Sequence, residues 1–183
     1  MNKLINCYFE NWNLYLPLLH RPSFEENVRL GLHYRERSFG GIVLLVCAIG
    51  STWVYDPRIP VPTPVKSRGF HWFEQVAYEP WSMLARPKLH DLQICVVRPP
   101  FPCMSITCHV LIQARPKQLL AAYLTGSSSG QGDWTTLSLG LRMALDLGLH
   151  RKKTYSSIPA TEQELWRRAF WFVCSSATAI SQY

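Results

Sequence analysis

Cysteine and histidine are the residues of this chain best suited to metal binding or nucleophilic chemistry, and there are six of each. No two cysteines form a Cys-X-X-Cys pair. The nearest approach to a metal-binding pattern is Cys103, Cys108 and His109, which lacks a fourth ligand at suitable spacing. Four of the six cysteines lie in apolar segments, as buried thiols in a reducing compartment do. We therefore expect neither a zinc site nor a disulfide framework in this chain.

A catalytic arrangement is equally hard to assemble from these residues. The serines at 127–129 follow no nucleophile-elbow pattern, and the surrounding GSSSGQGDW lacks the Gly-Lys-Ser/Thr ending of a phosphate-binding loop. The adjacent Cys108 and His109 leave open one alternative, a small helical enzyme that depends on a thiol or a histidine. We expect no catalytic, cofactor-binding or metal-binding residue, and we predict that the chain is not an enzyme.

Other polar residues have a structural interpretation. His20 and His150 each follow an apolar run and precede an arginine, where an imidazole can bond a carbonyl at a helix end. Ser23 with Glu26, and Thr161 with Glu164, have the spacing of capping boxes, which begin helices. These positions therefore predict helix ends rather than hydrolysis.

Apolar residues at three- and four-residue steps predict helices along most of the chain. The expected helices cover about 4–16, 23–31, 38–53, 67–84, 88–97, 118–125, 133–148 and 161 onward. Asp133 is the predicted N-cap of the seventh helix, Gly148 is predicted to end it, and Arg142 is placed to pair with Asp146. Four prolines between 56 and 64 predict a loop. Trp166, Phe170 and Trp171 of the last helix are expected to pack in the core. The fold is thus predicted to be all-α.

Composition and charge narrow the class further. The chain has 183 residues, 48% of them hydrophobic and 13% aromatic, which is enough apolar surface for one folded domain with a sizeable core. The longest strongly apolar run, 42–50, is too short to span a bilayer, so no membrane partner is expected. The net charge is +7, but lysine and arginine are dispersed, and only 151–153 form a run, as expected of a solvated helix end. Direct nucleic-acid binding by this chain is a further alternative function, and it rests on the net positive charge alone.

Three motifs stand out along the chain: LPLLHRPSF at 16–24, WTTLSLGLRMALDLGLHR at 134–151 and EQELWRRAFW at 162–171. In order and roughly in spacing, they resemble the regulatory or middle homology domain of fungal zinc-cluster transcription factors. This domain is also called the xylanolytic transcriptional activator regulatory domain. The residues that carry the resemblance as structural family positions are Trp134, Gly140, Arg142, Asp146, Gly148, His150, Arg167, Arg168 and Trp171.

The resemblance implies a nuclear parent protein that regulates DNA-templated transcription. In such a parent, DNA binding and zinc binding belong to an N-terminal six-cysteine cluster, and no cysteine spacing in this chain matches that cluster. We therefore expect no cofactor in this chain, with zinc only in the cluster of the parent. The implied partners are other domains of the parent factor, DNA through the parent rather than through this chain, and a small-molecule effector.

Two departures from the family pattern affect the domain organisation. In the family, a segment like LHDLQ runs directly into one like QLLAAYLTGSS, whereas here about 94–117 intervenes with a proline-rich, unpatterned sequence. We interpret this segment as a non-native insert from a retained intron or a faulty gene model. The ending SSATAISQY replaces the family's continuation of the last helix. The chain is thus expected to be one irregular multi-helix domain over 1–183, incomplete at the C-terminus.

Overall fold

The computed structural model describes residues 1–14, 16–55, 69–76, 87–97, 130–156 and 158–180, without the side chains of 130–134 and 176–180. Within these ranges the chain is helical and contains no strand, which confirms the predicted all-α class. The elements in chain order are α1 (Asn2–Cys7), π-helical η1 (Tyr8–Trp12), α2 (Arg21–Arg29), α3 (Leu32–Arg35), α4 (Arg37–Gly50), 3-10 helical η2 (Ser51–Trp53), α5 (Phe70–Glu74), α6 (Leu89–Val97), α10 (Gly130–Asp146), 3-10 helical η4 (Lys152–Tyr155) and α11 (Ala160–Ile180).

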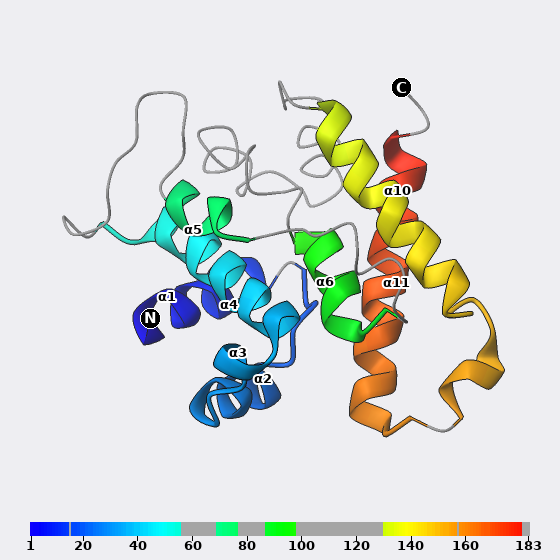
Figure 1. The fold of residues 1–183 in the computed structure, drawn as a ribbon, viewed down its shortest axis with the longest axis horizontal. Coiled ribbons are helices and arrows are strands. Elements are labelled where there is room, and N and C mark those ends of the chain that lie inside the picture. The colour runs from blue at the N-terminus through cyan, green and yellow to red at the C-terminus, as the bar shows by residue number, and fades with distance from the viewer. Residues whose placement is uncertain (15, 56–68, 77–86, 98–129, 157, 181–183) are drawn as a thin grey trace.

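Helix α4 is the centre of the N-terminal half. Its sequence is apolar nearly all round, and such a helix must be covered by neighbours on several sides. It contacts α1, α3, α5 and α6 (Figure 1). The contact with α1 is close at Gly50, where an added Cβ would lie 2.1 Å from the carbonyl oxygen of Leu4. Only glycine therefore allows this backbone approach.

Helix α6 joins the two halves of the described structure. It lies between α4 and the pair formed by α10 and α11 (Figure 1), and contacts all three helices. This position explains why its six residues from Leu92 to Val97 are all buried. A helix covered on two opposite sides has no wet face along this stretch, so its apolar residues do not follow a single stripe.

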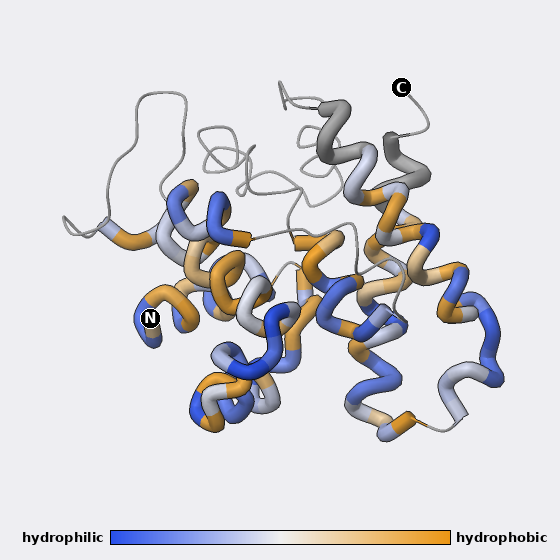
Figure 2. The backbone as a smooth tube through the Cα atoms, viewed as in Figure 1, coloured by the Kyte–Doolittle hydropathy of each residue, from blue (hydrophilic) through white to orange (hydrophobic). Residues whose placement is uncertain are grey.

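Helices α10 and α11 pack side by side and run in opposite directions (Figure 1). Figure 2 shows hydrophilic residues gathered in the turn between them, where Arg151, Lys152 and Lys153 are exposed. The basic run is therefore solvated, as predicted, but it lies in the connection between two helices rather than at the end of one. Among the described helices, none is both long and apolar enough to cross a membrane.

The N-terminal helix is shorter than predicted. It ends at Cys7 and continues as a π-helix to Trp12, closed by the Asn13 N–H donating to the Tyr8 carbonyl at 2.9 Å. The predicted extension to residue 16 is wrong. Pro17 disfavours helical backbone at the residue before it, and the side chain of Asn13 is bound to Leu19 instead.

Both predicted capping boxes are wrong. Helix α2 begins at Arg21, because Pro22 is tolerated in a first turn, and the Ser23 hydroxyl lies 2.8 Å from Nδ1 of His20. Glu26 forms an ion pair with Arg29 at 2.6 Å rather than a cap. Helix α11 likewise begins at Ala160, before Thr161, and its Glu164 pairs with Arg168. In each case an arginine three or four residues later competes successfully for the carboxylate.

The structure tests several of the other predicted helix boundaries. The predicted helices at 38–53 and 88–97 are present with nearly the predicted bounds. Asp133 is not an N-cap, because α10 already begins at Gly130. The predicted helix at 67–84 is present as α5 but ends earlier than predicted, because Gln75 and Val76 are not helical. Residues 67–68 and 77–84 of this prediction, the predicted loop at 56–64 and the predicted helix at 118–125 lie outside the described residues.

Candidate functional site

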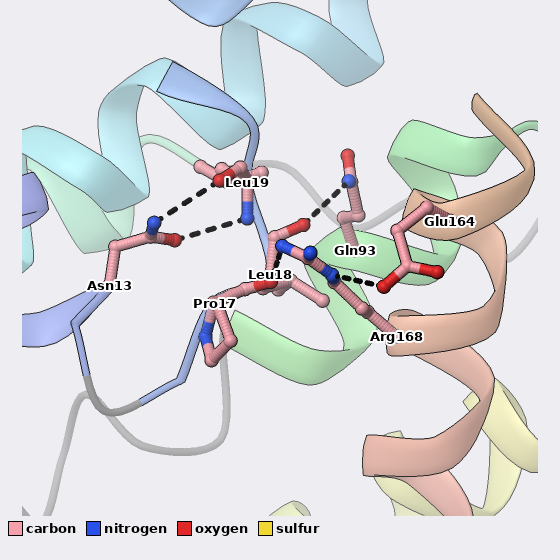
Figure 3. A network of polar contacts seen from close by, with 7 residues as sticks. All are labelled: Asn13, Pro17, Leu18, Leu19, Gln93, Glu164 and Arg168. Carbon is pink, nitrogen blue, oxygen red and sulfur yellow. Dashed lines mark hydrogen bonds and ion pairs between the residues drawn. The ribbon is translucent and has the colours of Figure 1, made fainter. Parts of the chain in front are cut away.

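The segment before α2 is held between α6 and α11 by hydrogen bonds to its main chain (Figure 3). Nε2 of Gln93 donates to the Leu18 carbonyl at 3.3 Å, and Nη1 of Arg168 donates to the Pro17 carbonyl at 3.2 Å. Residues 17 and 18 lie outside any helix, so their carbonyls need partners from elsewhere. We call this contact, made by Asn13, 17–19, Gln93 and Arg168, the junction.

Asn13 fixes the other side of the same segment. Its Nδ2 donates to the Leu19 carbonyl at 3.1 Å, and its Oδ1 accepts from the Leu19 N–H at 3.1 Å (Figure 3). The side-chain amide therefore satisfies both main-chain groups of Leu19. With the backbone oriented in this way, Leu18 and Leu19 are both buried in the hydrophobic core.

Arg168 is positioned by its own helix. Nε of Arg168 lies 2.8 Å from Oε1 of Glu164, one turn earlier in α11, while Nη1 reaches Pro17. Both side chains of the ion pair are about half exposed, at 40% and 51%, so the pair itself adds little stability. Its role is to orient the guanidinium toward the junction, because a rigid fork can serve two acceptors at once.

A cleft of about 270 Å³ opens beside the junction, between the 16–18 segment and α11. Its residues are Leu16, Pro17, Leu18, Glu164, Arg167, Arg168, Trp171 and Phe172. Trp171 is 68% exposed, so the prediction that it packs in the core is wrong. The buried face of α11 carries Ala169 and Val173, and a residue two positions from each of them points away from that face. Trp166 and Phe170 of the same stripe are buried and partly buried, as predicted.

Gly140 marks the closest approach of α10 to the core. A Cβ at this position would lie 3.0 Å from Cβ of Cys95 and 3.6 Å from Cγ2 of Val173. The glycine therefore allows α10 to contact both α6 and α11. Helix packing at such short range depends on a residue without a side chain.

Gly148 ends α10 as predicted. Its φ of 72° is left-handed, its N–H donates to the Leu145 carbonyl at 2.9 Å, and the Leu149 N–H donates to the Ala144 carbonyl at 3.0 Å. These two bonds form a Schellman motif, which satisfies the last carbonyls of a helix. Leu149 and Ala144 are both buried, so the same turn adds an apolar contact.

The remaining family positions lie on the surface of the two helices. Arg142 and Asp146 form the predicted ion pair at 3.1 Å, with both side chains exposed. The guanidinium of Arg167 lies 5.1 Å from the ring centroid of Tyr155. His150 is exposed and accepts a hydrogen bond from Nε of Arg151 at 3.1 Å, so its predicted bond to a helix-end carbonyl is wrong. Of Trp134, only the backbone is described.

The same correction applies to His20. It is the N-cap residue of α2, and its ring contacts Ser23 rather than a carbonyl at a helix end.

The family positions fall into two groups. Arg168 and Trp171 reach the junction or its cleft, whereas Gly140, Gly148 and the Arg142–Asp146 pair do not. The structure thus divides the family positions between packing of α10 and α11 and the surface beside the junction.

Three thiols of the described residues, those of Cys7, Cys47 and Cys174, are in surroundings that disfavour the thiolate. Burial raises the pKa of Cys47 to about 11 and also raises the pKa of Cys174. A catalytic cysteine needs the opposite shift. Cys108 and His109 lie outside the described residues. Within the part of the chain that is described, no three metal-binding side chains come together.

Two residues of the junction were missed by reasoning from sequence. Gln93 is only 2% exposed and interrupts the apolar run of α6, so a polar residue in a buried run was the available signal. Asn13 follows an apolar helical pattern and lies four residues before Pro17. Neither feature indicates that its side chain binds another segment. Its partner, Leu19, is identified only by the fold.

The described residues thus form a helical domain in which hydrogen bonds hold the 17–19 segment against α6 and α11. A cleft with several apolar side chains opens beside this contact. A family model described as "Fungal specific transcription factor domain" matches residues 111–176. Over this range, about a third of the chain, the sequence is therefore similar to fungal transcription factor domains, in line with the resemblance of its motifs.

Two curated relatives come from Fusarium oxysporum f. sp. lycopersici. The chain is 26% identical over 178 residues to Zn(2)-C6 fungal-type transcription factor FTF1a, and 25% identical over 178 residues to FTF1c. Each alignment covers 92% of this chain but only 14% and 16% of the two relatives. No solved structure matches the chain. The relatives are transcription factors by name, which gives the enzyme alternative no support.

Proposed function

We propose that this domain modulates the activity of a nuclear transcription factor that binds zinc and DNA through a cluster outside these residues. The printed names of both relatives contain the Zn(2)-C6 designation, and the chain corresponds to a small part of their length. The domain itself acts without chemistry, by binding other parts of its parent. Zinc and DNA are then partners of the parent, and a small-molecule effector is a partner of this domain.

The observation that carries the mechanism is the exposed Trp171 in the cleft beside the junction. Tryptophan is strongly enriched at the centres of protein interfaces, because it buries a large apolar area with few lost rotamers. The cleft also contains the apolar side chains of Leu16 and Phe172 and the cation of Arg167. We assign this cleft to docking of another domain of the same factor, with Arg168 keeping the 16–18 wall in place.

Trp171→Ala in the full-length factor tests the docking surface. Because the side chain is 68% exposed, its removal should leave folding intact and should change transcription from a reporter with the factor's own promoter by about fivefold or more, as loss of a hot-spot residue does. Tyr55→Ala is the matched control, since Tyr55 is also aromatic and is 83% exposed. Equal reporter activity of wild type and Trp171→Ala at equal protein level would contradict the assignment.

The zinc and DNA part of the proposal has its own test. Binding of the full-length factor to promoter DNA should be lost after zinc removal by a chelator and restored by added zinc. The 183-residue chain should bind the same DNA only weakly and without sequence preference, and salt should abolish that binding. Salt-resistant, sequence-specific binding by the chain alone would instead place DNA recognition in this domain.

We also propose that the chain forms part of one domain over 1–183, and that about 94–117 is a non-native insertion into it. Residues Ile94 to Val97 are buried in α6, and 98–117 lie outside the described residues. Sequencing of the full-length cDNA, through the upstream region and across codons 94–118, tests this. A spliced transcript without the segment supports the insertion, and transcripts that always retain it contradict it.

A further inference from the structure

A second concave surface lies along α4, apart from the junction. It is a half-open groove of about 720 Å³, which is within the usual size range of small-molecule sites. Residues of α4 line it together with residues of α3, α5, α6 and α10. Its apolar walls include Leu44, Cys47, Trp72, Val76, Ile94 and Met143. We call it the α4 groove.

His33 supplies an unexplained polar group in this groove. Both ring nitrogens are shielded from water, and neither has a hydrogen-bond partner among the described residues. An imidazole always has at least one N–H to donate, and a buried polar group without a partner is costly. The ring lies 4.0 Å from the ring of Tyr34, centroid to centroid, and Tyr34 is 86% exposed. A ligand can reach a shielded ring nitrogen only if a neighbouring side chain moves, and Tyr34, at the surface, can move without repacking of the core.

The charged residues of the groove favour an anion. Arg35 and Arg37 line it near His33 in the chain. One carboxylate, Asp91, also lines it, but this carboxylate accepts hydrogen bonds from the Ser38 hydroxyl and from the Lys88 N–H, the latter at 2.8 Å. Asp91 is thus already satisfied, whereas His33 is not. The groove combines apolar walls with an unmet demand for a hydrogen-bond acceptor.

We propose that the α4 groove binds a small molecule with an apolar body and a single carboxylate. The carboxylate accepts a hydrogen bond from one ring nitrogen of His33 and is attracted by Arg35, and the apolar body lies against Leu44 and Trp72. A charged acceptor forms a stronger bond to the imidazole than a neutral hydroxyl does. The role of this molecule as an effector rests on the proposed function, but its binding does not.

Three probes that differ only in the head group test this proposal. 4-Phenylbutyrate, 4-phenylbutanol and 4-phenylbutylamine are titrated calorimetrically into the complete 183-residue chain. The acid should bind at least about tenfold more tightly than the alcohol, and the amine should bind most weakly, since it brings a second cation to the arginines. Absence of acid binding at millimolar concentration, or equal affinity for all three probes, overturns the proposal.

Variants locate the binding. His33→Phe keeps an aromatic ring but no nitrogen, so it should abolish the tenfold preference for the acid by weakening acid binding much more than alcohol binding. His150→Phe is the matched control at an exposed histidine outside the groove. Leu44→Trp fills the groove and should weaken all three probes. Arg35→Gln, at an exposed position, should reduce acid binding alone, and it serves as the test if circular dichroism shows His33→Phe to be unfolded.

The outcomes separate this inference from the proposed function. An unchanged acid preference in both His33→Phe and Arg35→Gln refutes the groove as a carboxylate site. The reporter effect of Trp171→Ala requires no ligand, so it stands or fails independently. If the acid binds and Leu44→Trp changes reporter activity in the full-length factor, the carboxylate ligand is an effector. If the acid binds and that variant has no effect on the reporter, binding is confirmed and the effector role is refuted.

Discussion

Replacement of Gly148 should test the end of α10 quantitatively. The residue has φ 72°, a left-handed conformation that costs an L-amino acid about 1–2 kcal/mol. An alanine Cβ would lie 3.3 Å from the hydroxyl oxygen of Thr154 and 3.9 Å from Cδ of Arg151, so space is nearly sufficient and backbone strain dominates. We therefore expect Gly148→Ala to lower the free energy of unfolding by about 1–2 kcal/mol.

Urea denaturation of the 183-residue chain, followed by circular dichroism, measures this loss as a lower midpoint at an unchanged slope. In a thermal scan, each kcal/mol corresponds to a shift of roughly 2–4 °C for a chain of this size. Gly148→Asn is the matched variant, because asparagine tolerates left-handed backbone and should cost less than alanine. The reasoning is refuted if alanine costs nothing measurable, or if asparagine costs as much as alanine.

Three further predictions concern stability. Gln93→Leu leaves the buried Leu18 carbonyl without its partner and should cost about 1–3 kcal/mol in the same urea assay; a neutral result would contradict the importance of the junction. Burial lowers the pKa of His90 below its usual 6.5, so its contribution to stability should be complete above pH 6.5 and lost as pH falls below it. Thermal unfolding between pH 7.5 and 5 checks this, and His90→Gln should flatten that part of the profile. Arg142→Ala should cost less than about 0.5 kcal/mol, because its ion pair with Asp146 is exposed; a larger loss would show that the pair has a further role.

Local features of the fold were largely predictable from the sequence. Periodic apolar residues located α4 and α6, and Gly148 located the end of α10, because these signals depend on neighbours within a few positions in the chain. The Arg142–Asp146 pair is of the same kind, since residues four apart meet on any helix. The motifs, in turn, indicated a resemblance to fungal regulatory domains without any knowledge of packing, and a family model for fungal transcription factors matches residues 111–176.

Helix starts were less predictable for a specific reason. Glu26 and Glu164 had the spacing of capping residues, but each also had an arginine within one turn. A carboxylate can serve either partner, and spacing alone does not decide between them. The surface position of Trp171 was missed because aromatic content alone does not show which side of α11 faces the core.

The sequence by itself determined the helical class, most helix positions and the similarity to fungal transcription factor domains. Only the tertiary structure decided that Asn13, Gln93 and Arg168 converge on the 17–19 segment, that Trp171 faces a cleft, and that His33 lines the α4 groove. Gln93 lies 75 residues from its partner Leu18, and Arg168 lies 151 residues from Pro17. Periodicity reports contacts within a few turns of helix, whereas contacts at such separations exist only once α4, α6 and α11 are packed together.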